Sequence, residues 1–185
     1  YLWAILRDDR GWGGAAPPGV VFHYRPGRKG EYAAEILDGF NGTIQVDAYG
    51  GYSHLATPKR SGGDPLRLAF CWAHGRRKLI KAKPQKGSPI VDEALLRIAA
   101  LYKVEDAIRG SDPDHRRTVR QELSRPLVDA FFAWLKAQAA RVSRKSDLAE
   151  AMAYMLKRQD DFRLFLDDGR VDIDSVPDLG STVSL

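Results

Sequence analysis

The sequence predicts an α/β fold in which a sheet-containing first part is followed by a helical second part. Residues 1–80 contain short runs of aromatic and β-branched residues separated by Gly and Pro, which is the pattern of strands and turns. From Ser88 onward these runs stop, and apolar residues recur at every third or fourth position, as in packed helices. We therefore expect an α/β core over residues 1–87, a helical insertion subdomain over residues 88–169 and a divergent, disordered tail over residues 170–185.

Strands and helices alternate in the first part. The expected strands cover residues 1–7, 20–24, 43–47 and 66–72. A Gly- and Pro-rich connector joins the first two, which predicts a hairpin with an enlarged loop. Residues 30–40 have helix spacing, and the basic segment 74–83 begins a second helix. This order is typical of a sheet covered by helices.

The second part contains three expected helical segments. The Ser-Pro pair at 88–89 and the Asp-Pro pair at 112–113 each combine a capping side chain with a proline suited to a first helical turn. We expect Pro126 to break or kink the second helix. The last helix opens at Ser146 and stops at Gly169, after which the apolar periodicity is lost.

The charge of the chain favours a polyanionic partner. Lys and Arg number 29 against 24 Asp and Glu, so the net charge is +5. The clearest basic cluster lies on the helix expected after Trp72, where Leu79 and Ile80 can anchor the opposite face. We take its members as candidate DNA-binding residues: His74, Arg76, Arg77, Lys78 and Lys81. The alternative is a solvated helix face.

Asp47 is the best single candidate for chemistry. If Ile44 and Val46 face the core, Asp47 points the other way at the carboxyl end of its strand, where α/β sheets place ligands. The Gly-Gly pair at 50–51 leaves room for a ligand or a second backbone. The alternative interpretation is a solvated aspartate that ends the strand and caps the next turn.

Two further motifs are weaker. Asp8 and Asp9 are adjacent on a strand and flanked by arginines, so we expect salt bridges rather than a metal-binding pair. Cys71 and His74 lack the partners that zinc requires. One cysteine and no apolar run long enough to span a bilayer favour a cytoplasmic protein with no membrane partner.

Eight ordered blocks resemble one known family. They are YLWAILRDDRGWGG, VVFHYRPGRKGE, GFNGTIQVDAYGGY, CWAHGRRK, RIAALYKVEDAIRG, SRPLVDAFFAWL, KSDLAEAMAYML and FLDDGRVDID. Together they extend over residues 1–174 and are similar to the IS66-type insertion-sequence transposases.

The resemblance implies a ribonuclease-H-like core of the DDE class. In that class three acidic residues hold two divalent ions, Mg²⁺ or Mn²⁺, for phosphoryl transfer on DNA. Asp47, in QVDAYGGY, matches the second acid and would be both a catalytic residue and a metal ligand. The implied partner is DNA at the ends of an insertion sequence, and the implied location is the nucleoid of a bacterial cytoplasm.

The resemblance also predicts that this chain is inactive alone. The family's first acid lies on a strand upstream of the segment matched by residues 1–7. Its third acid is a glutamate that follows an Asn-Asn run after the segment matched by GRVDID. Here Asp174 is followed by SVPDLGSTVSL, without a glutamate. We assign neither Asp172 nor Asp174 to that role, so the α/β core is expected to be incomplete.

Two other functions stay open. The chain could be a non-catalytic module that binds DNA, an intact transposase or a second copy of itself, as the basic helix suggests. Alternatively, Asp47 and His74 could form the acid/base couple of an unrelated hydrolase.

Overall fold

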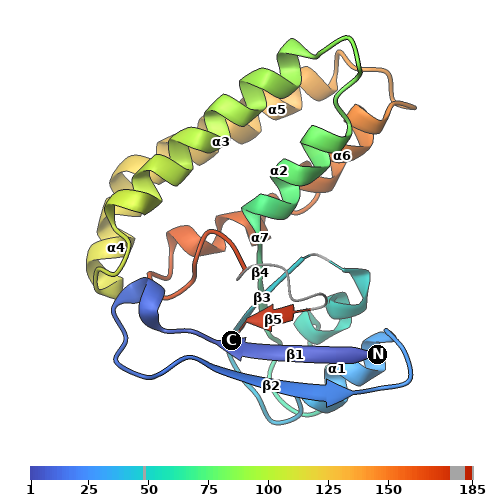
Figure 1. Ribbon diagram of the computed structural model, residues 1–185. Coiled ribbons are helices and arrows are strands. Elements are labelled where there is room, and N and C mark those ends of the chain that lie inside the picture. The colour runs from blue at the N-terminus through green and yellow to red at the C-terminus, as the bar shows by residue number, and fades with distance from the viewer. Residues whose placement is uncertain (48, 176–181, 185) are drawn as a thin grey trace.

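The computed structural model describes residues 1–47, 49–175 and 182–184. Figure 1 shows a sheet at one end of the molecule and long helices extending from it. The strands are β1 (Leu2–Arg7), β2 (Gly19–Tyr24), β3 (Thr43–Val46), β4 (Arg67–Phe70) and β5 (Thr182–Ser184). The helices are α1 (Gly30–Ile36), α2 (Trp72–Lys81), α3 (Pro89–Ala107), α4 (Pro113–Val119), α5 (Arg125–Ala139), α6 (Asp147–Leu156) and α7 (Gln159–Arg163).

The five described strands form one mixed sheet in the order β2-β1-β5-β3-β4. β1 and β2 pair antiparallel, with Leu2 opposite Tyr24, as the hairpin prediction required. β3 and β4 pair parallel, with Thr43 opposite Arg67. β5 lies between the two pairs, parallel to β1 and antiparallel to β3. The predicted α/β class is thereby confirmed as a mixed α/β architecture.

β3 is buried on both of its faces. Ile44 and Val46 are fully buried in the core, as the alternation predicted. Gln45 faces the other way but is also buried, because its Nε2 donates a hydrogen bond to the backbone oxygen of Asp172 at 2.7 Å. The segment around Asp172 therefore covers the second face of β3.

This packing corrects the expectation of a disordered tail from residue 170. Val171 and Ile173 are buried, and the oxygen of Ile173 accepts a hydrogen bond from the backbone nitrogen of Trp72 at 3.1 Å. Residues 170–175 are held because two apolar side chains enter the core at alternate positions. Of the remaining tail, residues 182–184 form β5, and residues 176–181 and 185 lie outside the described part of the chain.

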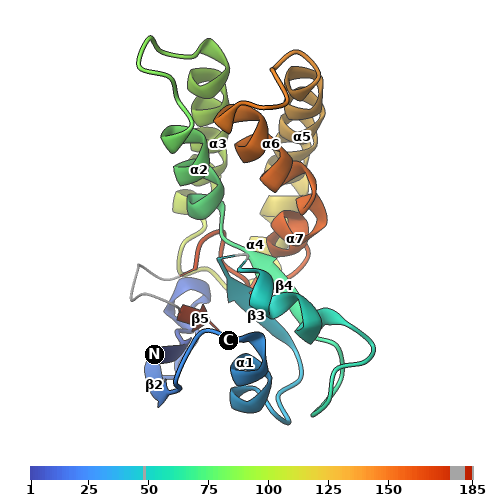
Figure 2. The same cartoon turned by 90° about the vertical axis from the view of Figure 1, so that its right-hand side faces the viewer.

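The helices pack as two neighbouring pairs above the sheet. α3 packs against α5 and α2 packs against α6, and Figure 1 shows each pair side by side. In Figure 2, turned by 90°, α2 and α3 lie on one side and α5 and α6 on the other. Trp72 is at the centre of their core, with its ring 5.4 Å from the rings of Phe131 and Phe162. One continuous hydrophobic core includes buried residues of the sheet and of the helices. Trp72 is thus a core residue, as its side chain predicts.

One helix boundary agrees with the expected one and another differs. As expected, the second helix is interrupted next to Pro126: α4 ends at Val119, a π-helical turn covers Arg120–Ser124, and the proline lies in the first turn of α5. The last helix is divided, since α6 ends at Leu156 and α7 begins at Gln159. Arg158, between them, leaves the helical conformation with φ −126° and ψ 22°.

Candidate functional site

Asp47 directly follows β3, the position that the sequence predicts. Its Oδ1 accepts a hydrogen bond from the backbone nitrogen of Tyr49 at 3.0 Å, and its backbone oxygen accepts one from the Tyr154 hydroxyl at 3.1 Å. The first bond is the turn-capping contact of the alternative interpretation. The second joins the end of β3 to α6. Asp47 is half-buried, so its carboxylate is oriented and also reached by solvent.

Two tyrosines that follow Asp47 in the sequence pack together with Arg28. The Arg28 guanidinium lies 4.8 Å from the ring centre of Tyr49, whose hydroxyl donates to the Arg28 backbone oxygen at 2.7 Å. Tyr52 is buried and packs edge-on against Tyr49. Burial, reinforced by the charge of Asp47, raises the pKa of Tyr52. At neutral pH the phenol is therefore a neutral hydroxyl beside a carboxylate.

Tyr154 joins Asp47 to the basic helix α2. Besides its bond to Asp47, Tyr154 has the Lys78 Nζ 4.6 Å and the Arg158 guanidinium 5.0 Å from its ring centre. Burial raises the pKa of Tyr154 to about 12; Arg158 opposes this shift and Asp47 adds to it. The structure thus brings Asp47 and Lys78, two separately predicted candidates, to the same tyrosine.

The other basic candidates lie along α2. The exposed basic residues of α2 are Arg76, Arg77, Lys78 and Lys81. Leu79 is buried and anchors the opposite face, as predicted, but Ile80 is 41% exposed and does not. Gly75 allows the close approach of α6, because a Cβ at this position would lie 2.8 Å from the Cε of Met155. Lys78 and Lys81 share a hollow with Asp147 and Glu150 of α6. The acidic first turn of α6 therefore offsets part of the charge on that side of α2.

Cys71 and His74 do not form a zinc site in the described residues. Cys71 is buried, and its Sγ lies 3.6 Å from the Oδ1 of Asp174. The Nε2 of His74 lies 2.9 Å from the Nη2 of Arg77. Within the described ranges, no group of three or more His, Cys, Asp or Glu could hold a metal ion.

Asp8 and Asp9 form the salt bridges expected of them. Arg10 Nη2 lies 2.7 Å from an Asp8 carboxylate oxygen, and Arg7 Nη2 lies 2.5 Å from one of Asp9. The Arg10 hydrogen bonds lower the pKa of Asp8, against the opposing effect of burial. These two carboxylates are thus committed to their neighbouring arginines.

The profile of a transposase family, described as "Transposase IS66 family", matches residues 1–176. The chain belongs to the IS66 transposase family. This confirms the resemblance and supports a role related to transposition at insertion sequences. No solved structure matches the chain.

Three curated relatives of this IS66-family chain are uncharacterized proteins of Sinorhizobium fredii. The first, y4qI, is 38% identical over 177 residues, and y4hP and y4jD are each 39% identical, over 182 and 175 residues. The matches cover 95%, 92% and 94% of this chain but 33%, 33% and 34% of the respective relatives. The chain therefore spans about a third of their length.

Family membership implies a divalent metal ion in general, but the described residues of this IS66-family chain do not form a site for one. Asp47 is a suitable oxygen ligand. A site for two ions needs further carboxylates converging on the same point, and the described ranges contain no such group. They also contain no helix long and apolar enough to cross a membrane.

The IS66-family chain also contains a buried ionic cluster that the sequence analysis missed. Arg120 is 0% exposed, and its guanidinium donates to both carboxylate oxygens of Glu105, at 2.8 and 2.6 Å. Its Nη1 also donates to the backbone oxygens of Phe165 and Val171, each at 2.8 Å. One signal was present: Glu105 follows Leu101 by four residues, on the apolar stripe of α3.

Asp174 was not assigned a role, yet it holds the start of α2. Its Oδ1 accepts hydrogen bonds from the backbone nitrogen of Ala73 at 2.7 Å and from the Tyr102 hydroxyl at 3.0 Å. Burial raises the pKa of Asp174, although both hydrogen bonds oppose the shift. The carboxylate therefore caps a helix whose own N-cap, Cys71, makes no side-chain capping bond.

Proposed function

We propose that this IS66-family chain is the central part of a DDE transposase with a ribonuclease-H-like sheet, in which Asp47 is the second of the three catalytic acids. The observation that carries the proposal is the position of Asp47 at the end of β3, linked through Tyr154 to the basic helix α2. A mixed sheet with an antiparallel hairpin and a parallel pair is compatible with that fold.

DNA is the substrate class that this arrangement favours. The exposed arginines of α2 can contact phosphates, while Tyr154 fixes the backbone beside Asp47. We further propose that residues 1–185 alone bind DNA without cutting it. The support is that the described residues contain no group of three or more His, Cys, Asp or Glu that could hold a metal ion, whereas a two-ion site needs several converging carboxylates.

Catalysis is tested with purified protein, DNA carrying insertion-sequence ends, and Mg²⁺ or Mn²⁺. We expect no nicking and no strand joining above the level of Asp47→Ala. If the unchanged chain nicks DNA and Asp47→Ala abolishes the nicking, residues 1–185 are sufficient for catalysis, which contradicts this part of the proposal. The same outcome would support the role of Asp47.

DNA binding is tested by fluorescence anisotropy on duplex DNA at increasing salt. If Arg76 and Arg77 each neutralise a phosphate, replacing both with Ala should reduce the slope of log affinity against log salt by about 2. The matched control replaces Arg117 and Lys136, which are exposed on α4 and α5, and should leave the slope unchanged. If both double variants reduce this slope equally, α2 is not the element that contacts the DNA.

The basic helix also favours a second candidate function. The chain could act without catalysis, occupying DNA ends or joining an intact transposase or a second copy of itself. Adding this chain to an active IS66-family transposase distinguishes the two. Inhibition that persists in Asp47→Ala and is lost on replacing Arg76 and Arg77 would identify a binding module.

A further inference from the structure

The edge of the sheet that β2 forms is open. β2 is the outermost strand in the order of the sheet, and among the described strands it pairs with β1 alone. Figure 2 shows it at the margin of the molecule. Its register with β1 is continuous from Gly19 to Tyr24, so no bulge bends this edge away from a neighbouring chain. β2 therefore presents an uninterrupted, unpaired edge.

The backbone of every second residue in β2 faces this open edge. Next to the strand, the amino group of Tyr1 donates to the Arg25 oxygen at 2.5 Å, and the Arg25 nitrogen donates to the Tyr1 oxygen at 2.9 Å. In an antiparallel pair such bonded positions alternate with unbonded ones. The odd-numbered residues of β2 are therefore bonded to β1, and the even-numbered residues direct their N–H and C=O groups away from it. These are Val20, Phe22 and Tyr24.

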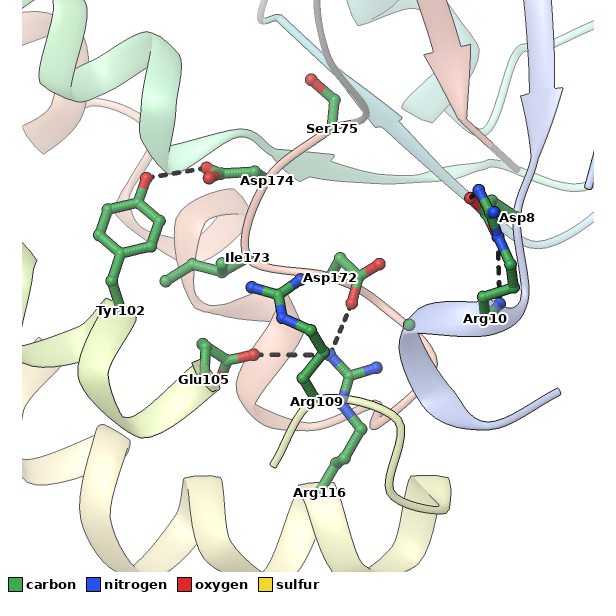
Figure 3. A pocket seen from close by; sticks show the side chains of 11 residues that line it. Asp8, Arg10, Tyr102, Glu105, Arg109, Arg116, Asp172, Ile173, Asp174 and Ser175 are labelled. Carbon is green, nitrogen blue, oxygen red and sulfur yellow. Dashed lines mark hydrogen bonds and ion pairs between the residues drawn. The ribbon is translucent and has the colours of Figure 1, made fainter. Parts of the chain in front are cut away.

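The outward backbone groups have almost no partners within the described residues. There, only the oxygen of Tyr24 accepts a hydrogen bond, from the exposed Arg25 Nη1 at 2.9 Å. The cavity drawn in Figure 3 differs, because its buried Arg116 is already paired with Asp172, at 2.6 Å. The edge of β2, in contrast, offers hydrogen-bonding groups that a neighbouring chain can reach.

The side chains at the same positions are apolar and exposed. Val20, Phe22 and Tyr24 are 42%, 53% and 72% exposed. Leu2 lies opposite Tyr24 on the same face of the sheet and is also exposed. Edge strands of monomeric proteins commonly carry a charged residue or a proline that prevents pairing, and residues 19–24 contain neither. β2 thus lacks the features that keep an edge strand single.

We propose that β2 pairs antiparallel with β2 of a second copy of this chain, about a two-fold axis at Phe22. In this register Phe22 lies opposite Phe22, and Val20 lies opposite Tyr24 of the second copy. Once Arg25 releases the oxygen of Tyr24, every outward N–H and C=O group of the three residues has a partner in the other copy. Aromatic pairs and pairs of an aromatic with a β-branched residue are favourable across strands.

A second copy fits this edge because the strand is complementary to itself. Two-fold pairing places residues of one strand opposite residues of the same strand, so a charge at its centre would meet a like charge, and residues 19–24 carry no Lys, Arg, Asp or Glu. Arg25, the next cation, would lie opposite Gly19 of the second copy. The other possible occupant is a segment from the part of the longer relatives that this chain does not span.

The contact is small, so we expect a weak, reversible dimer. A stable interface involves about 20–30 residues a side, whereas β2 has 6. The dissociation constant should therefore be on the order of tens of micromolar. The proposed interface contains neither Asp47 nor the basic face of α2.

The first test is sedimentation equilibrium of the whole chain over a range of protein concentrations, without DNA. We expect a monomer–dimer equilibrium that Phe22→Lys weakens at least tenfold, because this change removes an aromatic pair and places two like charges opposite each other. The matched control is Leu96→Lys, which introduces the same charge at an exposed leucine of α3 and should leave the equilibrium unchanged. A chain that stays monomeric throughout, or a dimer that both variants weaken equally, would overturn the proposal.

The second test is hydrogen exchange of the unchanged chain, measured by NMR at a low and a high protein concentration. The amides of Val20, Phe22 and Tyr24 should exchange more slowly at the high concentration, because the second copy then protects them. The amides of Val21 and His23 are the internal control, since they are already bonded to β1. If the first three amides exchange equally fast at both concentrations, β2 does not join two copies. Neither test contains DNA, so neither depends on the proposed roles of Asp47 and α2.

Discussion

At the residue scale, Asp174 links three segments of the chain. Its carboxylate oxygen accepts bonds from Ala73 at the start of α2 and from Tyr102 on α3, although these residues are far from it in sequence. The same burial that makes these bonds strong also disfavours the charge of the carboxylate. Asp174 therefore holds α2 in position through its hydrogen bonds. Its buried charge, however, lowers the stability of the folded state at pH values where the carboxyl is ionised.

Replacing Asp174 with Asn should separate these two effects. Burial raises the folded-state pKa above the ordinary 3.8, so the folded state holds the proton more tightly than the unfolded state. The tighter proton binding stabilises the folded state. This stabilisation is complete below the pKa of the unfolded state and is lost as the pH rises through the raised pKa of the folded state. Asp174→Asn keeps an acceptor oxygen and does not ionise. We expect its free energy of unfolding, relative to the unchanged chain, to increase over that pH range.

Urea denaturation at several pH values measures this difference. Asp174→Ala is the comparison, because it loses the capping bond to Ala73 and should be less stable than Asp174→Asn by about 1 kcal/mol. A constant difference between the unchanged chain and Asp174→Asn from pH 3 to pH 8 would show that the carboxylate does not titrate in the folded state as described.

Single residues could be predicted where local pattern decides their environment. The strand alternation placed Ile44 and Val46 in the core and Asp47 at the strand end, and the flanking arginines predicted the pairing of Asp8 and Asp9. Tyr154 could not be found in this way. Its contact with Asp47 spans 107 residues of sequence, and no local pattern encodes such a distance.

At the element scale, the strands β1 to β4 and the capped helix starts were predictable because their signals are short-range. β5 was not predicted, because it lies in the segment that was expected to be disordered. The division between α6 and α7 was not predicted either, since the apolar spacing continues through it. The interruption at Arg158 redirects the chain so that the backbone oxygen of Phe162 accepts a hydrogen bond from Trp72 Nε1 at 3.0 Å. A tertiary contact therefore overrides the local helix pattern.

The contact between α3 and the segment after α7 depends on the buried pair of Arg120 and Glu105. Replacing Arg120 with Met leaves a buried carboxylate with a weaker set of partners, and we expect a loss of about 3–5 kcal/mol in the free energy of unfolding. Urea denaturation measures the loss.

The double variant Arg120→Met with Glu105→Met should lose less than the sum of the two single changes, because neither charge is then left alone. The exposed Arg117→Met is the control and should change stability by less than about 0.5 kcal/mol. Additive losses from Arg120 and Glu105 would mean that the two side chains do not act as a pair.

At the scale of the whole molecule, buried residues of the sheet and of the helices belong to one hydrophobic core. The hydrophobic core is continuous from Ile44 of the sheet to Trp72 and Phe131 of the helices. The sequence could indicate a strand-rich part and a helix-rich part, but not that one core joins them. That depends on α2, which begins at the end of β4 and packs among the helices.

A shared core should make the sheet and the helices unfold together. We expect a single cooperative thermal transition, with the same midpoint by far-ultraviolet circular dichroism and by the fluorescence of Trp72 and its neighbours in the core. Phe131→Ala, which removes a ring 5.4 Å from Trp72, should lower the midpoint of both signals equally while destabilising by about 3–5 kcal/mol. Two separate transitions, of which Phe131→Ala shifts only one, would show that the helices fold independently of the sheet.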